Sequence, residues 1–329
     1  MPVTLEGPLS WPDAGVLVTG GTGSFGHRFV ESMLTRYRPR RLVVFSRDEL
    51  KQSEMAARFS DPSLRFFVGD VRDRERLARA MHGVDVVFHA AAMKQIPACE
   101  YNPFEAIQTN VLGAKNVIDA AIDAGVKRVI GLSTDKACQP LNLYGATKLC
   151  AEKLFVQGNV YGHPRGTAFS VVRYGNVVGS RGSVVPIFAA QRASGRVTVT
   201  DRAMTRFWIA LADGVEFAIR GAELMRGGEI FVPKIPSMRI MDLVETIAPG
   251  CVIEDIGIRP GEKLHEILMS EDESRQAVEQ DGMFVIEPVE PSWAFRRWEG
   301  KRPARGFRYS SDANDVWLSP AAMREMAGE

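Results

Sequence analysis

A tyrosine and a lysine four residues apart are the first candidates for chemistry in this sequence. Tyr144 and Lys148 stand in the segment Tyr-Gly-Ala-Thr-Lys. Residues i and i+4 project from one face of a helix, so the ammonium can lie near the phenol and stabilise its anion. A phenol titrates at about 10 in water and needs such help to act as a base at neutral pH. The pair is common on its own and becomes informative only through its neighbours.

Polar residues precede this pair, at the end of an apolar run at residues 127–133. Ser133, Thr134, Asp135 and Lys136 follow one another there. Hydroxyl groups at a strand end, followed by the Tyr and Lys pair, favour hydride chemistry at an alcohol carbon. Lys136 offers an amine and Asp135 a carboxyl group, which can act as base and acid. The simpler interpretations are a helix cap for Asp135, a surface charge for Lys136 and a turn for the hydroxyl residues.

A glycine-rich turn follows the first apolar run, at residues 16–19. Glycine removes the Cβ atoms that would keep a pyrophosphate from a helix N-terminus, whose N–H groups and positive dipole end favour an anion. A tight turn without a ligand is the alternative, but the position between a predicted strand and a predicted helix favours a dinucleotide. We expect cofactor contacts from Gly20, Thr22, Gly23, Ser24, Phe25 and Gly26.

The end of the second predicted strand, at residues 41–45, bears on the choice between NAD and NADP. Ser46, Arg47 and Asp48 follow this strand, and Lys51 comes one helical turn later. An acidic residue here would bind the ribose hydroxyls of NAD, whereas an arginine accommodates the 2′-phosphate of NADP. Because Arg47 comes first, the sequence predicts NADP. The alternative is that Arg47 and Lys51 are solvated charges at a helix start.

The third predicted strand, at residues 64–68, adds a possible adenine contact. Asp70 and Val71 follow it and supply a carboxylate and an exposed backbone edge. Asp70 as a helix cap is the alternative.

Short apolar runs alternate with helix-length amphipathic segments through the first half of the chain. The runs lie at residues 16–19, 41–45, 64–68, 84–90, 127–133 and 168–174. This rhythm predicts a parallel sheet, and continuous apolar strands predict helices on both faces, which is the doubly wound Rossmann arrangement of an α/β protein. We expect an NADP-binding domain over residues 1–175, a later strand near 229–233 that returns to the sheet, and a smaller, mainly substrate-binding domain over residues 176–329.

The overall composition excludes several classes of protein. The 41 Lys and Arg residues balance 40 Asp and Glu residues, so there is no excess of positive charge for nucleic acid. Five His and four Cys residues form no CxxC or HxxxH pair, so the sequence predicts neither a metal site nor a disulfide framework. No apolar run approaches the roughly 20 residues that span a bilayer. The N-terminus lacks the pattern of a secretory signal, and we expect a cytoplasmic protein.

These motifs together resemble the extended short-chain dehydrogenase/reductase family, which acts mainly on nucleotide sugars. A closer similarity covers nearly the whole chain, and it is to the inverting UDP-N-acetylglucosamine 4,6-dehydratases of bacterial pseudaminic acid biosynthesis. The similar segments are SRDELKQSEM (46–55), HAAAMKQIPACEYNP (89–103), STDKACQPLNLYGATKL (133–149), RYGNVVGSRGSVVP (173–186), TRFWI (205–209) and RPGEKLHE (259–266). The inverting group carries Asp-Lys where Asp135 and Lys136 stand, whereas retaining dehydratases carry Asp-Glu there and 4-epimerases carry small residues. Cys138 departs from the expected small residue, which alters packing rather than chemistry.

The resemblance implies a reaction without net redox change. Tyr144, supported by Lys148, takes the proton of the sugar 4-OH while hydride leaves C4 for NADP. Lys136 then removes the C5 proton, Asp135 protonates the departing 6-OH, hydride returns to C6, and C5 is reprotonated from the opposite face. A lysine base must be neutral, although free lysine titrates at about 10.4. Burial and the nicotinamide would lower the pKa of Lys136 and Asp135 would raise it, and the sequence leaves the balance open.

The resemblance also implies contacts elsewhere in the chain. For the cofactor it adds Ala90, Ala91, Lys94, Ser133, Val177 and Val178, and for the UDP-amino-sugar it adds Lys94, Asn176, Val184, Thr200, Arg259 and Glu262. Arg259 could pair with phosphate oxygens in bidentate fashion, or it could be an ordinary surface residue before a Pro-Gly turn. We expect a homo-oligomer. The alternative functions are a UDP-sugar 4-epimerase or 5,6-dehydratase on the same fold, and a non-catalytic NADP-binding regulator.

Overall fold

The structure, a computed structural model, describes residues 9–179 and 184–328. The segment at 173–186 that resembles the inverting dehydratases is therefore described only in part. Residues 1–8, which belong to the stretch that lacks a secretory signal pattern, lie outside the described residues.

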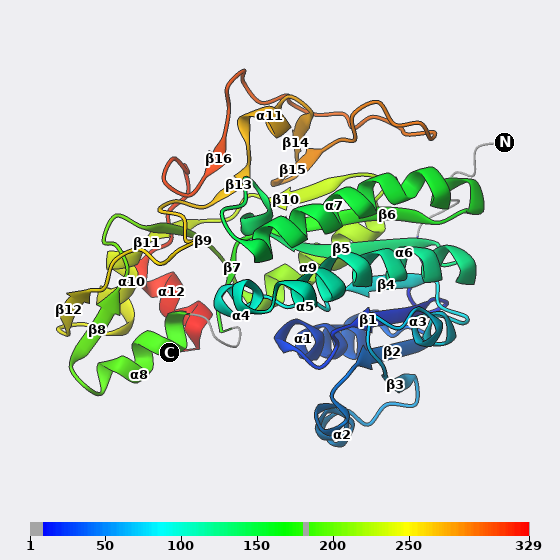
Figure 1. Cartoon of the computed structure of the whole chain (residues 1–329), viewed down its shortest axis with the longest axis horizontal. Coiled ribbons are helices and arrows are strands. Elements are labelled where there is room, and N and C mark those ends of the chain that lie inside the picture. Colours follow the sequence, from blue (N-terminus) through cyan, green and yellow to red (C-terminus); the bar gives the residue numbers. More distant parts are fainter. Residues whose placement is uncertain (1–8, 180–183, 329) are drawn as a thin grey trace.

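A nine-stranded sheet forms the centre of the molecule, in the order β14-β15-β10-β6-β5-β4-β1-β2-β3 (Figure 1). Its strands are β1 (Gly15–Thr19), β2 (Arg41–Ser46), β3 (Leu64–Val68), β4 (Val86–His89), β5 (Arg128–Thr134), β6 (Ala168–Tyr174), β10 (Ile230–Pro233), β14 (Ala277–Gln280) and β15 (Met283–Ile286). The strands from β1 to β6 and β10 pair in parallel, whereas β15 and β14 add antiparallel pairs at one edge. The predicted doubly wound parallel sheet is thus confirmed.

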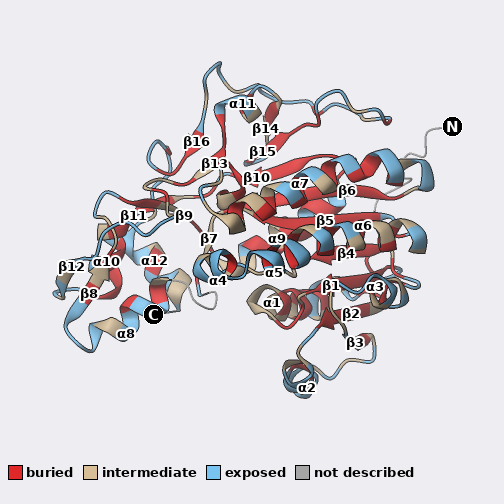
Figure 2. Ribbon diagram, viewed as in Figure 1, coloured by how far each residue is buried: buried red, intermediate tan, exposed pale blue. Residues whose placement is uncertain are grey.

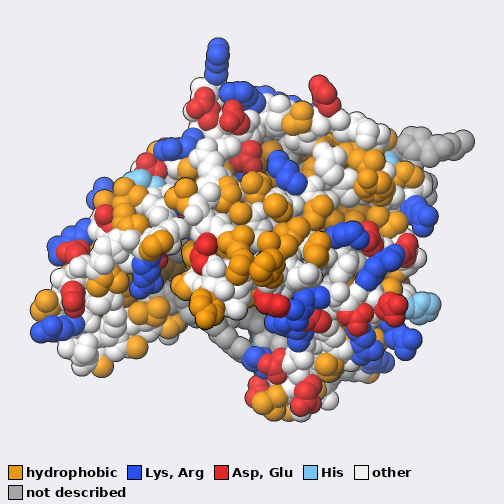
Figure 3. All heavy atoms as spheres, viewed as in Figure 1, with side chains coloured by type: hydrophobic (Ala, Val, Ile, Leu, Met, Phe, Trp, Pro, Cys, Tyr) orange, Lys and Arg blue, Asp and Glu red, His pale blue; other side chains and the backbone are white. Residues whose placement is uncertain are grey.

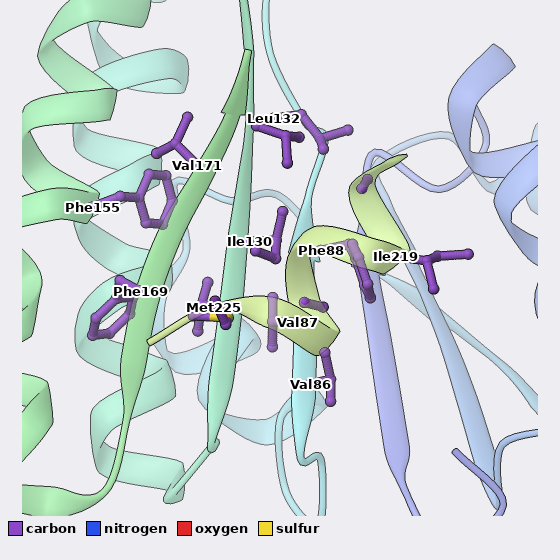
Figure 4. Packing of buried hydrophobic residues seen from close by; sticks show 14 of the residues in the cluster. Val86, Val87, Phe88, Ile130, Leu132, Phe155, Phe169, Val171, Ile219 and Met225 are labelled. Carbon is purple, nitrogen blue, oxygen red and sulfur yellow. The ribbon is translucent and has the colours of Figure 1, made fainter. Parts of the chain in front are cut away.

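Helices cover both faces of this sheet because its strands are apolar on both sides. One face carries α3 (Arg74–Ala80), α6 (Gly113–Ala124) and α7 (Leu143–Gly162), and the other carries α1 (Ser24–Ser32) and α9 (Leu211–Leu224). Figure 4 shows this packing, with Phe155 of α7 beside Phe169 of β6 and Ile219 of α9 close to Phe88 of β4. All of these side chains are almost wholly buried, so the position of α7 against β5 and β6 is firmly fixed.

Shorter elements surround the sheet. These are α2 (Glu49–Arg58), α4 (Ile96–Tyr101), α5 (Pro103–Ile107), two π-helical stretches η1 (Met33–Tyr37) and η2 (Gln108–Leu112), and two 3₁₀ turns η3 (Asp135–Ala137) and η4 (His163–Arg165). The turn η3 joins the end of β5 to the approach of α7. It therefore carries the predicted acid and base into the space above the strand ends.

A second lobe is built from residues after β6. Its strands are β7 (Asn176–Val177), β8 (Arg196–Val199), β9 (Thr205–Ile209), β11 (Ser237–Arg239), β12 (Val252–Asp255), β13 (Ile267–Met269) and β16 (Tyr309–Ser310), and its helices are α8 (Val184–Arg192), α10 (Ile240–Ile247) and α12 (Pro320–Ala327). The short helix α11 (Glu271–Ser274) lies beside β14 at the edge of the sheet. A separate buried cluster, which includes Trp208, Leu243 and Met323, holds part of this lobe together. Figure 2 shows buried faces on α10 and α12 where they pack together.

The order of the strands decides where a ligand can bind. The chain winds outward from β1 in both directions, because β2 lies on one side of β1 and β4 on the other. In doubly wound sheets the crevice at the carboxyl ends of the strands near such a reversal is the usual binding place. Over residues 9–179 and 184–328, no helix combines the length and the apolar character needed to cross a membrane.

Candidate active site

A cleft of about 750 Å³ lies at the carboxyl ends of the strands and reaches into the second lobe. Most of the predicted site residues line it, which brings together side chains from both lobes. They are Gly20, Thr22, Gly23, Ser24, Phe25, Ser46, Arg47, Asp48, Lys51, Asp70, Val71, Ala90, Ala91, Lys94, Ser133, Thr134, Lys136, Tyr144, Lys148, Asn176, Val177, Val184 and Glu262. The cleft is thus long enough to pass from the glycine turn to the segment before β13.

The glycine turn brings the start of α1 close to the end of β1. Gly20 has a φ of +64°, and a Cβ there would come within 2.8 Å of the Ala91 Cα. Gly26 does not line the cleft, but a Cβ on it would overlap the Gly21 carbonyl, so only glycine allows α1 to pack this closely. The turn therefore leaves backbone at the helix N-terminus open to the cleft, which suits a diphosphate.

The end of β2 carries both positive and negative side chains. Asp48 caps α2 by accepting a hydrogen bond from the Lys51 backbone N–H at 3.0 Å, and its carboxylate also pairs with the Lys51 ammonium. Arg47 is 59% exposed and lies 3.5 Å from Asp70. Asp70 is not a helix cap, since Asp73 caps α3. Arg47 can therefore turn toward a phosphate, whereas Asp48 is engaged in its cap.

Tyr144 and Lys148 both line the cleft from α7. The lysine that lowers the pKa of Tyr144, however, is Lys136. Lys148 donates a hydrogen bond to the Leu132 carbonyl at 2.6 Å, and burial lowers its pKa to about 8 although Glu152 opposes this. Burial raises the pKa of Tyr144 to about 12, and the cation that most lowers it is Lys136. Tyr144 is thus a neutral phenol at neutral pH.

Asp135 and Lys136 form an ion pair at the start of η3. Lys136 Nζ lies 2.9 Å from Asp135 Oδ1, which also accepts a hydrogen bond from the Thr134 hydroxyl at 2.8 Å. Asp135 is fully buried and does not line the cleft directly, while Lys136 is 23% exposed and does. Asn176 Oδ1 lies 3.5 Å from the same ammonium. The amine therefore faces the cleft and the carboxyl group lies just behind it.

A second carboxylate next to Lys136 was not predicted from the sequence. Glu266 Oε1 lies 3.4 Å from Lys136 Nζ, and Arg206 and Lys263 approach the same carboxylate at 3.8 Å. Burial lowers the pKa of Lys136, but the charges of Asp135 and Glu266 outweigh burial and raise the pKa above its ordinary value. The two carboxylates therefore decide the balance that the sequence left open, and Lys136 is an ammonium at neutral pH. Glu266 lies in the segment RPGEKLHE, but the sequence of that segment does not indicate that Glu266 contacts Lys136.

A buried ion network supports the back of α7. Arg173 is fully buried and pairs with Glu152 at 2.6 Å and with Glu273 at 2.8 Å. Cys138, the unexpected residue after η3, donates its thiol to Glu273 at 3.3 Å, and burial raises its pKa to about 12. The network joins α7, β6 and α11, so the second half of the chain helps to hold α7 in place. Cys138 remains a protonated thiol that fills space.

Several predicted residues do not line the cleft. Val178 is buried in the second core, and Thr200 donates a hydrogen bond to the Met204 sulfur at 3.1 Å. Arg259 is 62% exposed and lies 3.8 Å from Glu262, which does line the cleft. The described residues contain no group of three or more His, Cys, Asp or Glu side chains placed to hold a metal ion.

The fold and the cleft at its strand ends define an α/β protein of the doubly wound Rossmann class. The family described as "Polysaccharide biosynthesis protein" matches residues 16–288. The chain is 52% identical over 321 residues to the UDP-N-acetylglucosamine 4,6-dehydratase (inverting) of Campylobacter jejuni subsp. jejuni serotype O:2, which covers 94% of this chain and 96% of that enzyme. The chain therefore belongs to the polysaccharide biosynthesis protein family, and its resemblance to the inverting dehydratases is confirmed.

A relative with a different named activity and a solved structure are also similar to this chain. The UDP-glucose 4-epimerase of Rickettsia felis is 44% identical over 283 residues, which cover 83% of each chain. The X-ray structure of Pen from Bacillus thuringiensis superposes with a TM-score of 0.89 at 38% identity, over 97% of this chain and 98% of that one. The relatives named by activity act on nucleotide sugars, and this chain is an enzyme of that kind.

Proposed function

We propose that the protein is a UDP-N-acetylglucosamine 4,6-dehydratase that inverts C5 and yields a UDP-4-keto-6-deoxy-L-arabino-hexosamine. The observation that carries this proposal is the Asp135 and Lys136 pair at 2.9 Å, whose amine lines the cleft with Tyr144 while the carboxyl group is buried behind it. An epimerase that acts only at C4 needs no acid and base for C5 and C6. The relative of the same activity at 52% identity supports the proposal, and the pseudaminic acid pathway is the proposed destination of the product.

NADP is the proposed cofactor, and the residues present fit it. A Cβ on Gly20 would collide with the Ala91 backbone, so glycine lets the turn pack against the end of β4 and leaves the start of α1 at the cleft for a diphosphate. Arg47 and Lys51 place cations at the end of β2. When bound, NADP supplies a hydride acceptor that later returns the hydride. Because Asp48 is held as the cap of α2, Arg47 is the better placed residue for the ribose substituent.

The side chains of this protein divide the reaction into steps. Tyr144 takes the proton from the sugar 4-OH as C4 is oxidised. To do so it must first release its own proton to solvent, which the Lys136 ammonium and the positive nicotinamide of bound NADP would favour. Oxidation turns C4 into a ketone and acidifies the proton on C5. Lys136 then removes the C5 proton, and Asp135 protonates the 6-oxygen so that it leaves as water. After hydride reaches C6, C5 receives a proton on the opposite face.

The ion pair must rearrange before it can act, since an ammonium is no base and a carboxylate is no acid. A shift of one proton from Lys136 Nζ to Asp135 Oδ1, over 2.9 Å, produces an amine and a carboxylic acid together. The number of protons on the pair does not change. Substrate that fills the cleft would exclude water from Lys136, which favours the neutral pair.

For the nucleotide sugar, we propose contacts with Lys94, Asn176, Val184 and Glu262, which line the cleft. Arg259 and Thr200 stay predictions, since neither side chain lines it.

A homo-oligomer is also proposed, with the protein in the cytoplasm. Apolar side chains gather on the surface over α4 and α5 (Figure 3). Tyr101 at the end of α4 is 88% exposed and Phe104 in α5 is 80% exposed. Exposed apolar side chains of this size favour burial against another chain, and a second copy is the partner we expect. Light scattering after size-exclusion chromatography would test this.

The central experiment is to incubate the protein with UDP-N-acetylglucosamine, without added reductant, and to identify the product by NMR. We expect a 4-keto-6-deoxy sugar with inverted C5, and deuterium placed on C4 of the substrate should reappear in the C6 methyl group. Extraction of the bound nucleotide from the purified protein should yield NADP. Washout of the label into solvent would exclude an internal hydride transfer.

A 4-epimerase is the second candidate, because the Rickettsia felis relative bears that name at 44% identity. It would return a C4 epimer that keeps its 6-OH. A 5,6-dehydratase would give a different unsaturated product, so the same NMR spectrum separates all three activities. A non-catalytic regulator would leave the substrate unchanged.

A further inference from the structure

The second lobe places a buried carboxylate beside the amine of Lys136. Glu266 is 3% exposed, and its Oε1 lies 3.4 Å from Lys136 Nζ. Its backbone is fixed on both sides, since its N–H donates to Ser311 Oγ at 2.9 Å and its carbonyl accepts from the Ser311 N–H at 2.8 Å. A carboxylate that is fixed and shielded from water acts strongly on a neighbouring charge.

The hydrogen bonds and ion pairs of the Glu266 carboxylate are too few and too long for its burial to stabilise the fold. Its Oε2 accepts no hydrogen bond from the described residues, and Lys263 is 3.8 Å away from it. Arg206 Nε lies 3.8 Å from Oε1, also beyond hydrogen-bond distance. A buried carboxylate with such loose partners costs folding free energy. Its placement against Lys136 therefore points to a role in the reaction.

All charged and titratable side chains near this amine must be considered together. Asp135 on η3 and Glu266 before β13 favour the ammonium, and Arg206 on β9 disfavours it. Tyr144 on α7 is a neutral phenol at neutral pH. Lys263 lies 3.8 Å from Glu266 and donates to the carbonyls of Asp135 and Cys138, at 3.3 Å and 2.5 Å. The two carboxylates are the groups closest to the Lys136 ammonium.

We propose that Glu266 is a positioning residue that keeps on the Asp135 and Lys136 pair the single proton needed for dehydration. Elimination requires Lys136 as an amine and Asp135 as a carboxylic acid at the same time, so the pair must hold one proton. If that proton is lost to solvent, elimination stops. The negative charge of Glu266 retains the proton. It also stabilises the ammonium that forms when Lys136 takes the C5 proton, which makes Lys136 a stronger base. This inference rests on the proposed dehydratase function.

The test compares the charge of Lys136 in the parent protein and in Glu266→Gln. Trace acetylation at a series of pH values, followed by mass spectrometry of the peptide that contains Lys136, reports when its amine becomes neutral. Loss of the neighbouring negative charge disfavours the ammonium. The midpoint of labelling should therefore move to lower pH by roughly one to three units, the usual effect of one adjacent charge.

Activity gives a second readout. Glu266→Gln should still oxidise C4, seen as absorbance of reduced nicotinamide, and its KM for UDP-N-acetylglucosamine should stay unchanged. Its kcat for dehydration should fall, and should fall further at alkaline pH where the parent still works. A purely structural role would instead impair oxidation and dehydration together.

Two variants serve as controls. Glu266→Asp keeps the charge at a longer distance, so its labelling midpoint should lie between those of the parent and Glu266→Gln. Glu287→Gln removes another buried carboxylate, which pairs with Arg302 at 2.9 Å and does not line the cleft, and it should leave the Lys136 midpoint unchanged.

The outcomes separate this inference from the proposed function. Labelling curves that superimpose for parent, Glu266→Gln and Glu266→Asp would overturn the role of Glu266. Should Glu266→Gln fail to fold, the shift in Glu266→Asp alone decides the matter. A parent protein that forms no 4-keto product would refute the dehydratase proposal, but the labelling shift would still show whether Glu266 sets the charge of Lys136.

Discussion

Replacement of Lys136 separates the two halves of the proposed reaction. Lys136→Ala removes the proposed base for C5, and general-base loss usually costs roughly 100-fold to 10,000-fold in rate. It also removes the cation that most lowers the pKa of Tyr144, so C4 oxidation should slow as well. Lys136→Arg is the sharper variant, because a guanidinium keeps the positive charge but does not deprotonate. We expect it to oxidise C4 at close to the parent rate and to lose dehydration by at least about 100-fold.

The structure also gives the expected cost in stability. In Lys136→Ala two carboxylates, Asp135 and Glu266, lose their closest cation, and breaking a buried pair costs about 3–5 kcal/mol. Lys136 is 23% exposed, and Arg206 and Lys263 remain 3.8 Å from Glu266, so a smaller loss of about 1–3 kcal/mol is expected. Urea denaturation measures this difference, and Lys136→Arg should lose less.

Rapid mixing with UDP-N-acetylglucosamine gives the decisive assay. Absorbance of reduced nicotinamide reports C4 oxidation, deuterium uptake from D₂O reports removal of the C5 proton, and NMR reports the product. Tyr144→Phe should abolish the absorbance itself, whereas Lys136→Arg should keep it and lose the later two signals. Dehydration by Lys136→Arg within about tenfold of the parent rate would refute the role of Lys136 as the C5 base.

Three further changes test the cofactor turn and the core. Arg47→Ala should weaken the affinity for NADP about tenfold to a hundredfold, because a charge-assisted phosphate contact is lost, and it should leave the affinity for NAD the same. Nucleotide titrations measure both affinities, and an equal loss for NADP and NAD would contradict this prediction. Gly26→Ala should yield protein without bound nucleotide and with a lower melting temperature, since its Cβ overlaps the Gly21 carbonyl; extraction of full nucleotide content would speak against this. Burial lowers the pKa of His89 to about 3, so between about 6.5 and 3 the unfolded chain binds a proton that the native protein does not. Stability should therefore fall as pH drops below about 6.5, by up to about 1.4 kcal/mol per unit, and His89→Asn, which can still bond Thr19, should show a shallower fall in urea titrations.

The first half of the fold was predictable because each of its strands and helices has a recognisable pattern in the local sequence. The six apolar runs became β1 to β6, and the run near 229–233 became β10. The sequence did not reveal β14 and β15, although Met283–Ile286 is a short apolar run. A four-residue strand carries no periodicity of its own, and its place beside β10 depends on pairing across about fifty residues of chain. Antiparallel addition at the edge could therefore not be read from the rhythm that predicts a parallel sheet.

The site residues also fall into those that the local sequence predicts and those that it does not. Residues carried by strand ends and helix starts, such as Thr134 and Tyr144, could be placed from their spacing alone. Glu266 could not, because its effect on Lys136 comes from a chain segment that is distant in sequence and brought near only by the second lobe. The charge of Lys136 depends on both carboxylates, so local sequence left it open. The roles of the site residues themselves stay predictions until the variants are measured.

The place of β6 inside the sheet has a consequence for anyone who wishes to divide this protein for expression. All seven residues of Ala168–Tyr174 are buried, with β5 on one side and β10 on the other. A fragment ending at residue 175 would lose β10 and leave the backbone of β6 unpaired along a long, apolar edge. Such edges recruit strands from neighbouring molecules, so the fragment should collect in inclusion bodies. A shorter protein that stays soluble would have to retain Ile230–Pro233, even if much of the intervening lobe were replaced by a linker.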